Sequence, residues 1–140
     1  MRLKYFVLIL FVVILSNCAS CEKDKKRLQI GIKHRPKTCN EKSKKGDLLH
    51  VHYKVTYDNG TEFDNSYIRQ IPFTFTIGSG QVIKGWDQGL LGMCIGELRK
   101  LVVPSEMGYG KEGVVPSIPG SSTLIYYVEL LNVERKTFSF

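Results

Sequence analysis

Tryptophan, histidine and cysteine are scarce in this chain of 140 residues. It has one tryptophan, three histidines and four cysteines. The glycine-rich run 78–80 lacks the lysine and the following helix of a phosphate-binding loop. No serine–histidine or cysteine–histidine set indicates a nucleophile. His50 and His52 have no third ligand at a useful spacing, so we predict neither a metal site nor a cofactor.

No apolar run is long enough to span a bilayer, which needs about 20 residues. The longest run, residues 5–15, follows a short basic start and precedes small and polar residues, which is the layout of a secretory signal peptide. We expect residues 1–20 to be removed after Ser20, without stable membrane insertion. Such a signal directs the protein to the endoplasmic reticulum lumen or out of the cell. The tail at 135–140 carries no Lys-Asp-Glu-Leu type retrieval signal, so both locations stay open.

Secretion changes how the cysteines are interpreted. Cys18 leaves with the signal peptide and Cys21 lies at the cut, so Cys39 and Cys94 remain in a compartment that permits disulfides. A bridge between them would stabilise the fold by roughly 4 kcal/mol in the chain-entropy model. Cys18 and Cys21 have the spacing of a redox motif, but they straddle the cut and lack a βαβ context. A thiol oxidoreductase is therefore disfavoured.

The chain is basic, with a formal net charge of +7 at pH 7. Much of the excess positive charge gathers in the N-terminal segment 21–45, which also carries Cys39. Such runs are more often solvated tails than binding sites. No aromatic residues interleave with them, so no nucleic-acid partner is predicted.

Alternating apolar and polar residues, and elsewhere runs rich in β-forming residues, predict strands over most of the remaining chain. The predicted strands are residues 28–33, 48–57, 61–64, 72–77, 98–103 and 123–134. Residues 65–71 are expected to form a bulge or loop, and residues 105–122 a long loop with a function of its own. Asn59-Gly60 indicates a type I′ hairpin turn. Asn59-Gly60-Thr61 is also an N-glycosylation acceptor, although a tight turn is a poor substrate for glycan transfer.

One short helix is predicted in residues 82–90. Its apolar residues Ile83, Trp86, Leu90 and Leu91 fall on one face. Such a stripe usually means core, but a tryptophan at a helix start can also form the floor of an apolar cup. Gly85 allows another element to approach the backbone closely. Together, the predicted strands and helix indicate an α+β fold, an antiparallel sheet of about five strands with a helix across it.

Aromatic and aliphatic residues, with one carboxylate among them, are the remaining candidates for a site. They are Tyr53, Phe63, Phe73, Trp86, Tyr109 and Tyr126, with Val82, Ile83, Ile118 and Asp64. An apolar cup with a few polar groups is typical of a small-ligand or peptide site.

Five sequence blocks resemble the FKBP-type peptidyl-prolyl isomerases, the immunophilins that bind tacrolimus and rapamycin. They are Val51-His52-Tyr53, residues 60–64 (Gly-Thr-Glu-Phe-Asp), residues 82–86 (Val-Ile-Lys-Gly-Trp), Gly108-Tyr109-Gly110 and residues 123–131. The resemblance covers residues 46–134. The signal peptide with Cys39 and Cys94 resembles the endoplasmic-reticulum branch, whose small members have one disulfide.

The resemblance implies a monomer whose five- or six-stranded antiparallel sheet wraps around one short helix. It implies an enzyme that isomerises X–Pro bonds of proline-containing polypeptides in the secretory pathway and that tacrolimus and rapamycin inhibit. By position, Asp64, Tyr109, Trp86 and Phe63 would be the catalytic set. Tyr53, Phe73, Val82, Ile83, Ile118 and Tyr126 would bind substrate.

The resemblance also assigns individual roles. Trp86 would form the pocket floor, and Asp64 would accept a hydrogen bond from Tyr53 or a ligand, with Arg69 nearby. The Ile83 N–H and the Tyr109 hydroxyl would hold ligand carbonyls.

The chain departs from the family pattern at the pocket rim. Tyr126 stands where many relatives have phenylalanine, Ser117 replaces a bulkier residue of some relatives, and Val114 and Val115 alter a loop. These departures affect the expected drug affinity and substrate preference more than isomerase activity. The alternative function is a catalytically weak peptide-binding chaperone or docking module with the same cup.

Overall fold

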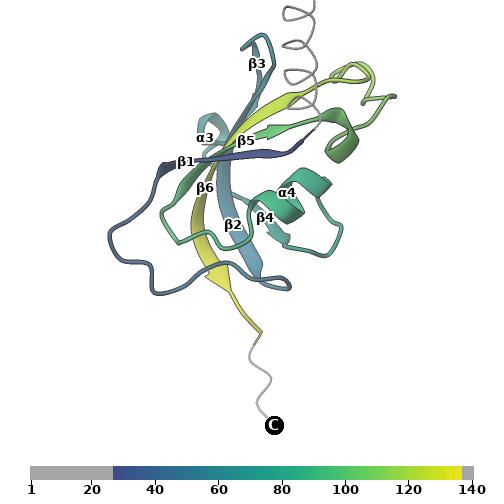
Figure 1. The fold of residues 1–140 in the computed structure, drawn as a ribbon. Helices are drawn as coiled ribbons and strands as arrows, with labels where there is room; N and C mark the ends of the chain where they lie inside the picture. Colours follow the sequence, from purple (N-terminus) through teal and green to yellow (C-terminus); the bar gives the residue numbers. More distant parts are fainter. Residues whose placement is uncertain (1–26, 137–140) are drawn as a thin grey trace, which may run out of the picture.

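The computed structural model describes residues 27–136, so the predicted signal peptide and its cut lie outside the described residues. Residues 27–136 form six strands, two short helices and one 3-10 turn (Figure 1). In order they are β1 (Gln29–His34), β2 (Leu48–Tyr57), β3 (Glu62–Asn65), α3 (Ser66–Arg69), β4 (Phe73–Thr76), α4 (Lys84–Gly89), β5 (Leu98–Val103), η1 (Ser105–Met107) and β6 (Leu124–Glu134).

The strands form one antiparallel sheet in the order β1-β5-β6-β2-β3, and β4 also pairs with β2. The sheet curves past α4, which lies against one of its faces (Figure 1). The predicted α+β class is confirmed, and so are the predicted bounds of β2 and β5. The segment before residue 46 contributes β1, which pairs with β5 at the sheet edge.

β3 and β4 share one edge of β2. β4 pairs with the first half of β2 and β3 with the second half. The predicted loop between them is wrong, because α3 forms there as a single helical turn. The Asn65 side chain accepts a hydrogen bond from the Tyr67 N–H at 3.0 Å and caps the turn. Gln70 ends it with a positive φ of 55°.

The hairpin between β2 and β3 does not have the predicted type I′ turn. Of the pair Asn59-Gly60, only Gly60 has a positive φ, at 87°. The Gly60 N–H donates to the Tyr57 carbonyl at 3.0 Å, and the Tyr57 N–H donates to the Thr61 carbonyl at 2.9 Å. The connection is therefore a wider turn that ends on a left-handed glycine, and not a two-residue loop.

α4 packs directly on β5 through two glycines one turn apart. A Cβ at Gly85 would lie 2.6 Å from Val103 Cγ1, and one at Gly89 would lie 2.9 Å from Leu101 Cδ2. Real Cβ atoms do not approach so closely, so the backbone of α4 touches the sheet only because these side chains are absent. The close approach expected at Gly85 is thus confirmed. Trp86, between the two glycines, is buried in the core.

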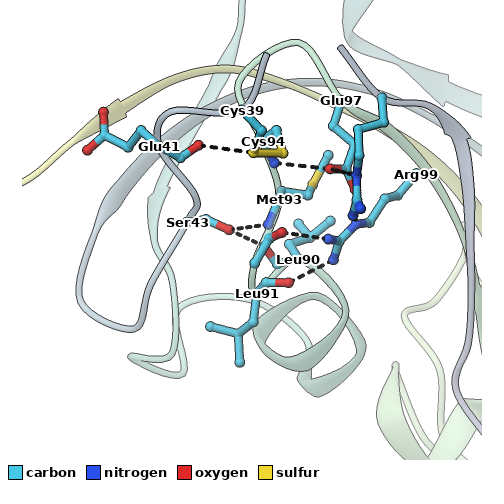
Figure 2. Close-up of a disulfide and its surroundings, with 11 residues drawn as sticks. Cys39, Glu41, Ser43, Leu90, Leu91, Met93, Cys94, Glu97 and Arg99 are labelled. Atoms are coloured by element: carbon cyan, nitrogen blue, oxygen red, sulfur yellow. Dashed lines mark hydrogen bonds and ion pairs between the residues drawn. A yellow bond between two sulfur atoms is a disulfide. The ribbon is translucent and has the colours of Figure 1, made fainter. Parts of the chain in front are cut away.

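A buried ion pair holds the C-terminal end of α4. Arg99 of β5 donates to the carbonyls of Gly89 and Leu91 at 2.8 Å and of Gly92 at 3.0 Å (Figure 2). Its charge is balanced by Glu97, which is fully buried and accepts from Arg99 Nε at 2.6 Å. Burial alone raises the pKa of Glu97, but the hydrogen bonds from Arg99 and from a backbone N–H outweigh it and lower that pKa.

The predicted disulfide between Cys39 and Cys94 is confirmed, with its two Cα atoms 5.4 Å apart (Figure 2). It joins the N-terminal loop to the segment that follows α4. Ser43 strengthens the same junction: its hydroxyl donates to the Leu90 carbonyl at 2.5 Å and accepts from the Met93 N–H at 2.9 Å. The segment behind the helix is therefore fixed by covalent and polar bonds together.

The close contact at Gly85 predicts that Gly85→Ala destabilises the protein, although alanine usually stabilises a helix relative to glycine. Alanine is normally favoured over glycine in a helix by about 1 kcal/mol. Here we expect the free energy of unfolding to fall by roughly 1–3 kcal/mol, because the new methyl group overlaps Val103. Urea unfolding followed by circular dichroism measures the change.

Gln88→Ala, at an exposed site on the same helix, is the matched control and should change stability by less than about 0.5 kcal/mol. Adding Val103→Ala should make the double variant less destabilised than the two single effects predict. A Gly85→Ala protein as stable as the parent would contradict the close contact.

Candidate functional site

A cavity of about 460 Å³ opens between α4 and the sheet. This is a typical volume for a small-ligand site. Its walls come from β2, β3, β4, β6, α4 and the loops that flank them. The lining residues are Tyr53, Val55, Phe63, Asp64, Phe73, Gln81, Val82, Ile83, Trp86, Tyr109 and Tyr126.

The structure brings nine of the ten sequence-predicted site residues to this cavity and leaves one out. Ile118 is buried in the core, only 7% exposed. It forms a β-bridge with Val114, with N–H to carbonyl distances of 2.7 and 2.8 Å. The bridge fixes the loop backbone, and the Ile118 side chain packs into the core instead of lining the cavity.

Two lining residues were not predicted. Val55 belongs to the inward face of β2, which the alternating pattern identified, but the pattern does not say which inward residues border a cavity. Gln81 had no signal in the sequence. Its side chain accepts a hydrogen bond from the Thr76 N–H at 2.9 Å, which ties the loop before α4 to β4.

Trp86 is the centre of the aromatic lining and is only 4% exposed. Tyr53, Phe73 and Tyr126 meet its ring edge-on, with centroids 5.4, 5.9 and 5.4 Å away. Phe75 packs behind it at 5.5 Å. Edge-to-face pairs of this kind are favourable beyond the area they bury, so the rings fix one another. The Trp86 Nε1–H has no hydrogen-bond partner among residues 27–136.

Asp64 forms the polar corner of the cavity. It accepts a hydrogen bond from the Tyr53 hydroxyl at 2.5 Å and pairs with Arg69 of α3. Arg69 Nη2 also donates to the Tyr53 hydroxyl at 3.1 Å, and the Asn65 N–H donates to Asp64 at 2.8 Å. The hydrogen bond expected from Tyr53 to Asp64 is therefore formed, and Arg69 lies beside the carboxylate as expected.

The same contacts set the charge state of the corner. Burial raises the pKa of Asp64, but the hydrogen bonds from Tyr53 and Arg69 outweigh it and hold that pKa below its usual value. Burial and the bond to Asp64 raise the pKa of Tyr53. Asp64 is thus a fixed carboxylate and Tyr53 a neutral phenol at neutral pH.

Phe63 and Asp64 both line the cavity although they are neighbours in β3. On a regular strand, adjacent side chains point to opposite faces. The register between β2 and β3 shifts between Val55 and Thr56, and this irregularity lets both side chains reach one space. Phe63 also stacks on Tyr57, with centroids 4.5 Å apart.

Tyr126 brings a second phenol into the cavity wall and is only 5% exposed. Its burial, and then the neighbouring Tyr109 hydroxyl, raise the pKa of Tyr126 well above the usual value. The hydroxyl that distinguishes Tyr126 from phenylalanine is therefore next to that of Tyr109, within the cavity lining.

Ile83 ends the loop that leads into α4. Its carbonyl accepts from the Trp86 and Asp87 N–H groups at 2.9 and 3.2 Å. Within the described part of the chain, its own N–H donates to no other group. The Ile83 N–H is therefore free to bind a ligand at the cavity.

The potential metal ligands among the described residues do not cluster. Between residues 27 and 136, no three or more histidine, cysteine, aspartate or glutamate side chains gather as a metal-binding group. His52 instead bonds to Ser66 and stacks on Tyr67, and His50 pairs with Glu134. None of the helices described is long and apolar enough to cross a membrane.

Comparison with known proteins agrees with this geometry. The model of the FKBP-type peptidyl-prolyl cis-trans isomerase family matches residues 39–131. The chain is 55% identical, over 98% of its own length and 99% of the relative's, to peptidyl-prolyl cis-trans isomerase FKBP2 of Homo sapiens.

Proteins of two other organisms are also similar to this chain. FK506-binding protein 2 of Dictyostelium discoideum is 51% identical over 95% of this chain and 99% of its own length. Peptidyl-prolyl cis-trans isomerase FKBP15-2 of Arabidopsis thaliana is 49% identical over 97% of this chain and 85% of its own length. The chain therefore belongs to the FKBP-type peptidyl-prolyl cis-trans isomerase family and is an isomerase of X–Pro peptide bonds.

Proposed function

We propose that this protein accelerates X–Pro isomerisation in polypeptides that fold in the secretory pathway, and that tacrolimus and rapamycin occupy the same cavity. The observation that carries the proposal is the ring of aromatic side chains around Trp86, in a cavity whose one charged corner, Asp64, is neutralised by Arg69.

The proposed mechanism rests on the physics of the amide bond. Rotation about an X–Pro bond takes tens to hundreds of seconds because amide resonance must be broken. The planar amide has more charge separation than the twisted one, and water stabilises it more. An apolar cavity removes that solvation and so brings the planar ground state closer in free energy to the twisted transition state. No proton transfer is required.

The polar groups of the cavity would position the substrate. The free Ile83 N–H and the Tyr109 hydroxyl are suited to hold the carbonyls on either side of the proline. Asp64 is held by Arg69 and the Asn65 N–H and in turn fixes the Tyr53 ring against Trp86. Its role is therefore to order the cavity wall.

Two observations support action in the secretory pathway. Residues 1–20 have the layout of a signal peptide. The bond between Cys39 and Cys94 is of a kind that persists in oxidising compartments.

Inhibition by tacrolimus and rapamycin is the finer part of the proposal. The Dictyostelium relative is named as an FK506-binding protein. In this chain Tyr126 places a hydroxyl in the wall that both drugs would contact, so we expect their affinity to differ from that of relatives with phenylalanine there.

The test is an isomerisation assay on the oxidised protein starting at Cys21, with an X–Pro peptide followed by NMR exchange. We expect acceleration that tacrolimus abolishes. Tacrolimus binding without acceleration at micromolar protein would favour the binding-module alternative. Acceleration that tacrolimus leaves unchanged would refute the shared cavity.

Replacing the carboxylate at the cavity corner should reduce turnover only partially. For Asp64→Ala we expect kcat/KM to fall about ten-fold, since loosening Tyr53 and unpairing Arg69 costs roughly 1.4 kcal/mol. Asp64→Asn keeps an acceptor for Tyr53 and should lose less. Asp58→Ala, an exposed aspartate of the same hairpin, is the matched control and should retain full activity. Complete inactivity of a folded Asp64→Ala protein would indicate proton transfer and contradict the mechanism.

The pH profile gives an independent test of the same mechanism. The pKa of Asp64 lies below its usual value, and those of Tyr53 and Tyr126 lie above theirs. None of the three groups should change protonation between roughly pH 5 and 9. We therefore expect a constant kcat/KM across this window, measured by NMR exchange without a coupling protease. A ten-fold change per pH unit inside the window would contradict it.

A further inference from the structure

The tip of the β2–β3 hairpin carries a sequence feature that the isomerase cavity does not use. Asn59-Gly60-Thr61 is the one Asn-Xaa-Ser/Thr triplet in the chain. Asn59 and Thr61 are both exposed, and neither lines the cavity.

The turn presents the Asn59 amide in a defined way. The Thr61 N–H donates to Asn59 Oδ1 at 3.0 Å, which makes a local Asx turn. Among the described residues, Asn59 Nδ2 makes no hydrogen bond. The tight type I′ turn, which would make this triplet a poor substrate, is not formed. A wider turn that closes on Gly60 takes its place.

The hairpin is anchored to the rest of the protein below its tip. Tyr57 stacks on Phe63, and its hydroxyl donates to the Ser117 carbonyl. Asp58, Asn59 and Gly60 are all exposed. A bulky group on Asn59 would therefore displace neither core residues nor cavity residues.

We propose that Asn59 is an N-glycosylation site, an inference that rests on the proposed passage through the secretory pathway. The donor class is a lipid-diphosphate-linked oligosaccharide. Asn59 Nδ2 forms a bond to the anomeric carbon of the sugar, the bond from that carbon to the diphosphate oxygen breaks, and one Nδ2 proton is lost. The glycan occupies the hairpin tip and leaves the isomerase cavity open.

The experiment expresses the full chain in a eukaryotic secretory host. The purified protein is treated with an amidase that removes N-linked glycans and converts the attachment residue to aspartate. We expect a mass shift equal to one glycan, lost on treatment, with aspartate at position 59 by peptide mass spectrometry. Asn59→Gln and Thr61→Ala should each abolish the shift. Asn132→Gln, an exposed asparagine outside any triplet, should keep it.

A second arm separates this inference from the proposed secretory placement. There, residues 1–20 are replaced by a signal segment of known strength, so entry does not depend on the chain's own N-terminus. Protein that is processed and has the Cys39–Cys94 bond but no glycan in this arm overturns the inference and leaves secretory placement standing. A glycan in this arm supports the inference even where the natural N-terminus directs no entry.

The glycosylated protein and the Asn59→Gln variant should have equal kcat/KM. A large difference would overturn the assignment of the glycan to a site clear of the cavity.

Discussion

The direct contact between the α4 backbone and β5 is the constraint on which the rest of the structure depends. Gly85 and Gly89 present no side chain of their own toward β5, so the α4 backbone takes a position directly against the side chains of Val103 and Leu101. That position turns Trp86 toward the aromatic residues of β2, β4 and β6. A helix held one side chain further from the sheet would open gaps around the indole and lose these edge-on contacts.

The bonds around the C-terminal end of α4 keep this contact in place. Arg99 binds the carbonyls of Gly89, Leu91 and Gly92 there, and Glu97 neutralises it. The disulfide and the hydrogen bonds of Ser43 fix the segment that follows the helix. Isolated buried charges are costly, but Arg99 and Glu97 hydrogen-bond to each other and to backbone groups, which favours one geometry. The bonds that hold this end of the helix therefore involve none of the residues that line the cavity.

Much of the fold could be predicted from the sequence, most clearly at residues 48–57, where apolar and polar residues alternate. The strands at 48–57 and 98–103 were identified with correct bounds. α3 was missed because a four-residue helix has no period to detect, and only Asn65 signalled its cap. Resemblance supplied most cavity residues, but Ile118 was misplaced because a bridge to Val114 sets its direction. Phe63 and Asp64 share the cavity through a register shift, which a regular strand pattern cannot express.

Trp86 is the chain's sole tryptophan, and it lies at the wall of the space that a ligand would enter. Its Nε1–H has no hydrogen-bond partner in the described part of the chain, and its ring is surrounded by those of Tyr53, Phe73, Phe75 and Tyr126. The protein therefore contains a natural fluorescent probe, because fluorescence excited in the absorption band of tryptophan comes from Trp86 alone. Occupation of the cavity and loss of the native packing both alter the surroundings of that single chromophore, so each can be followed in the unlabelled molecule.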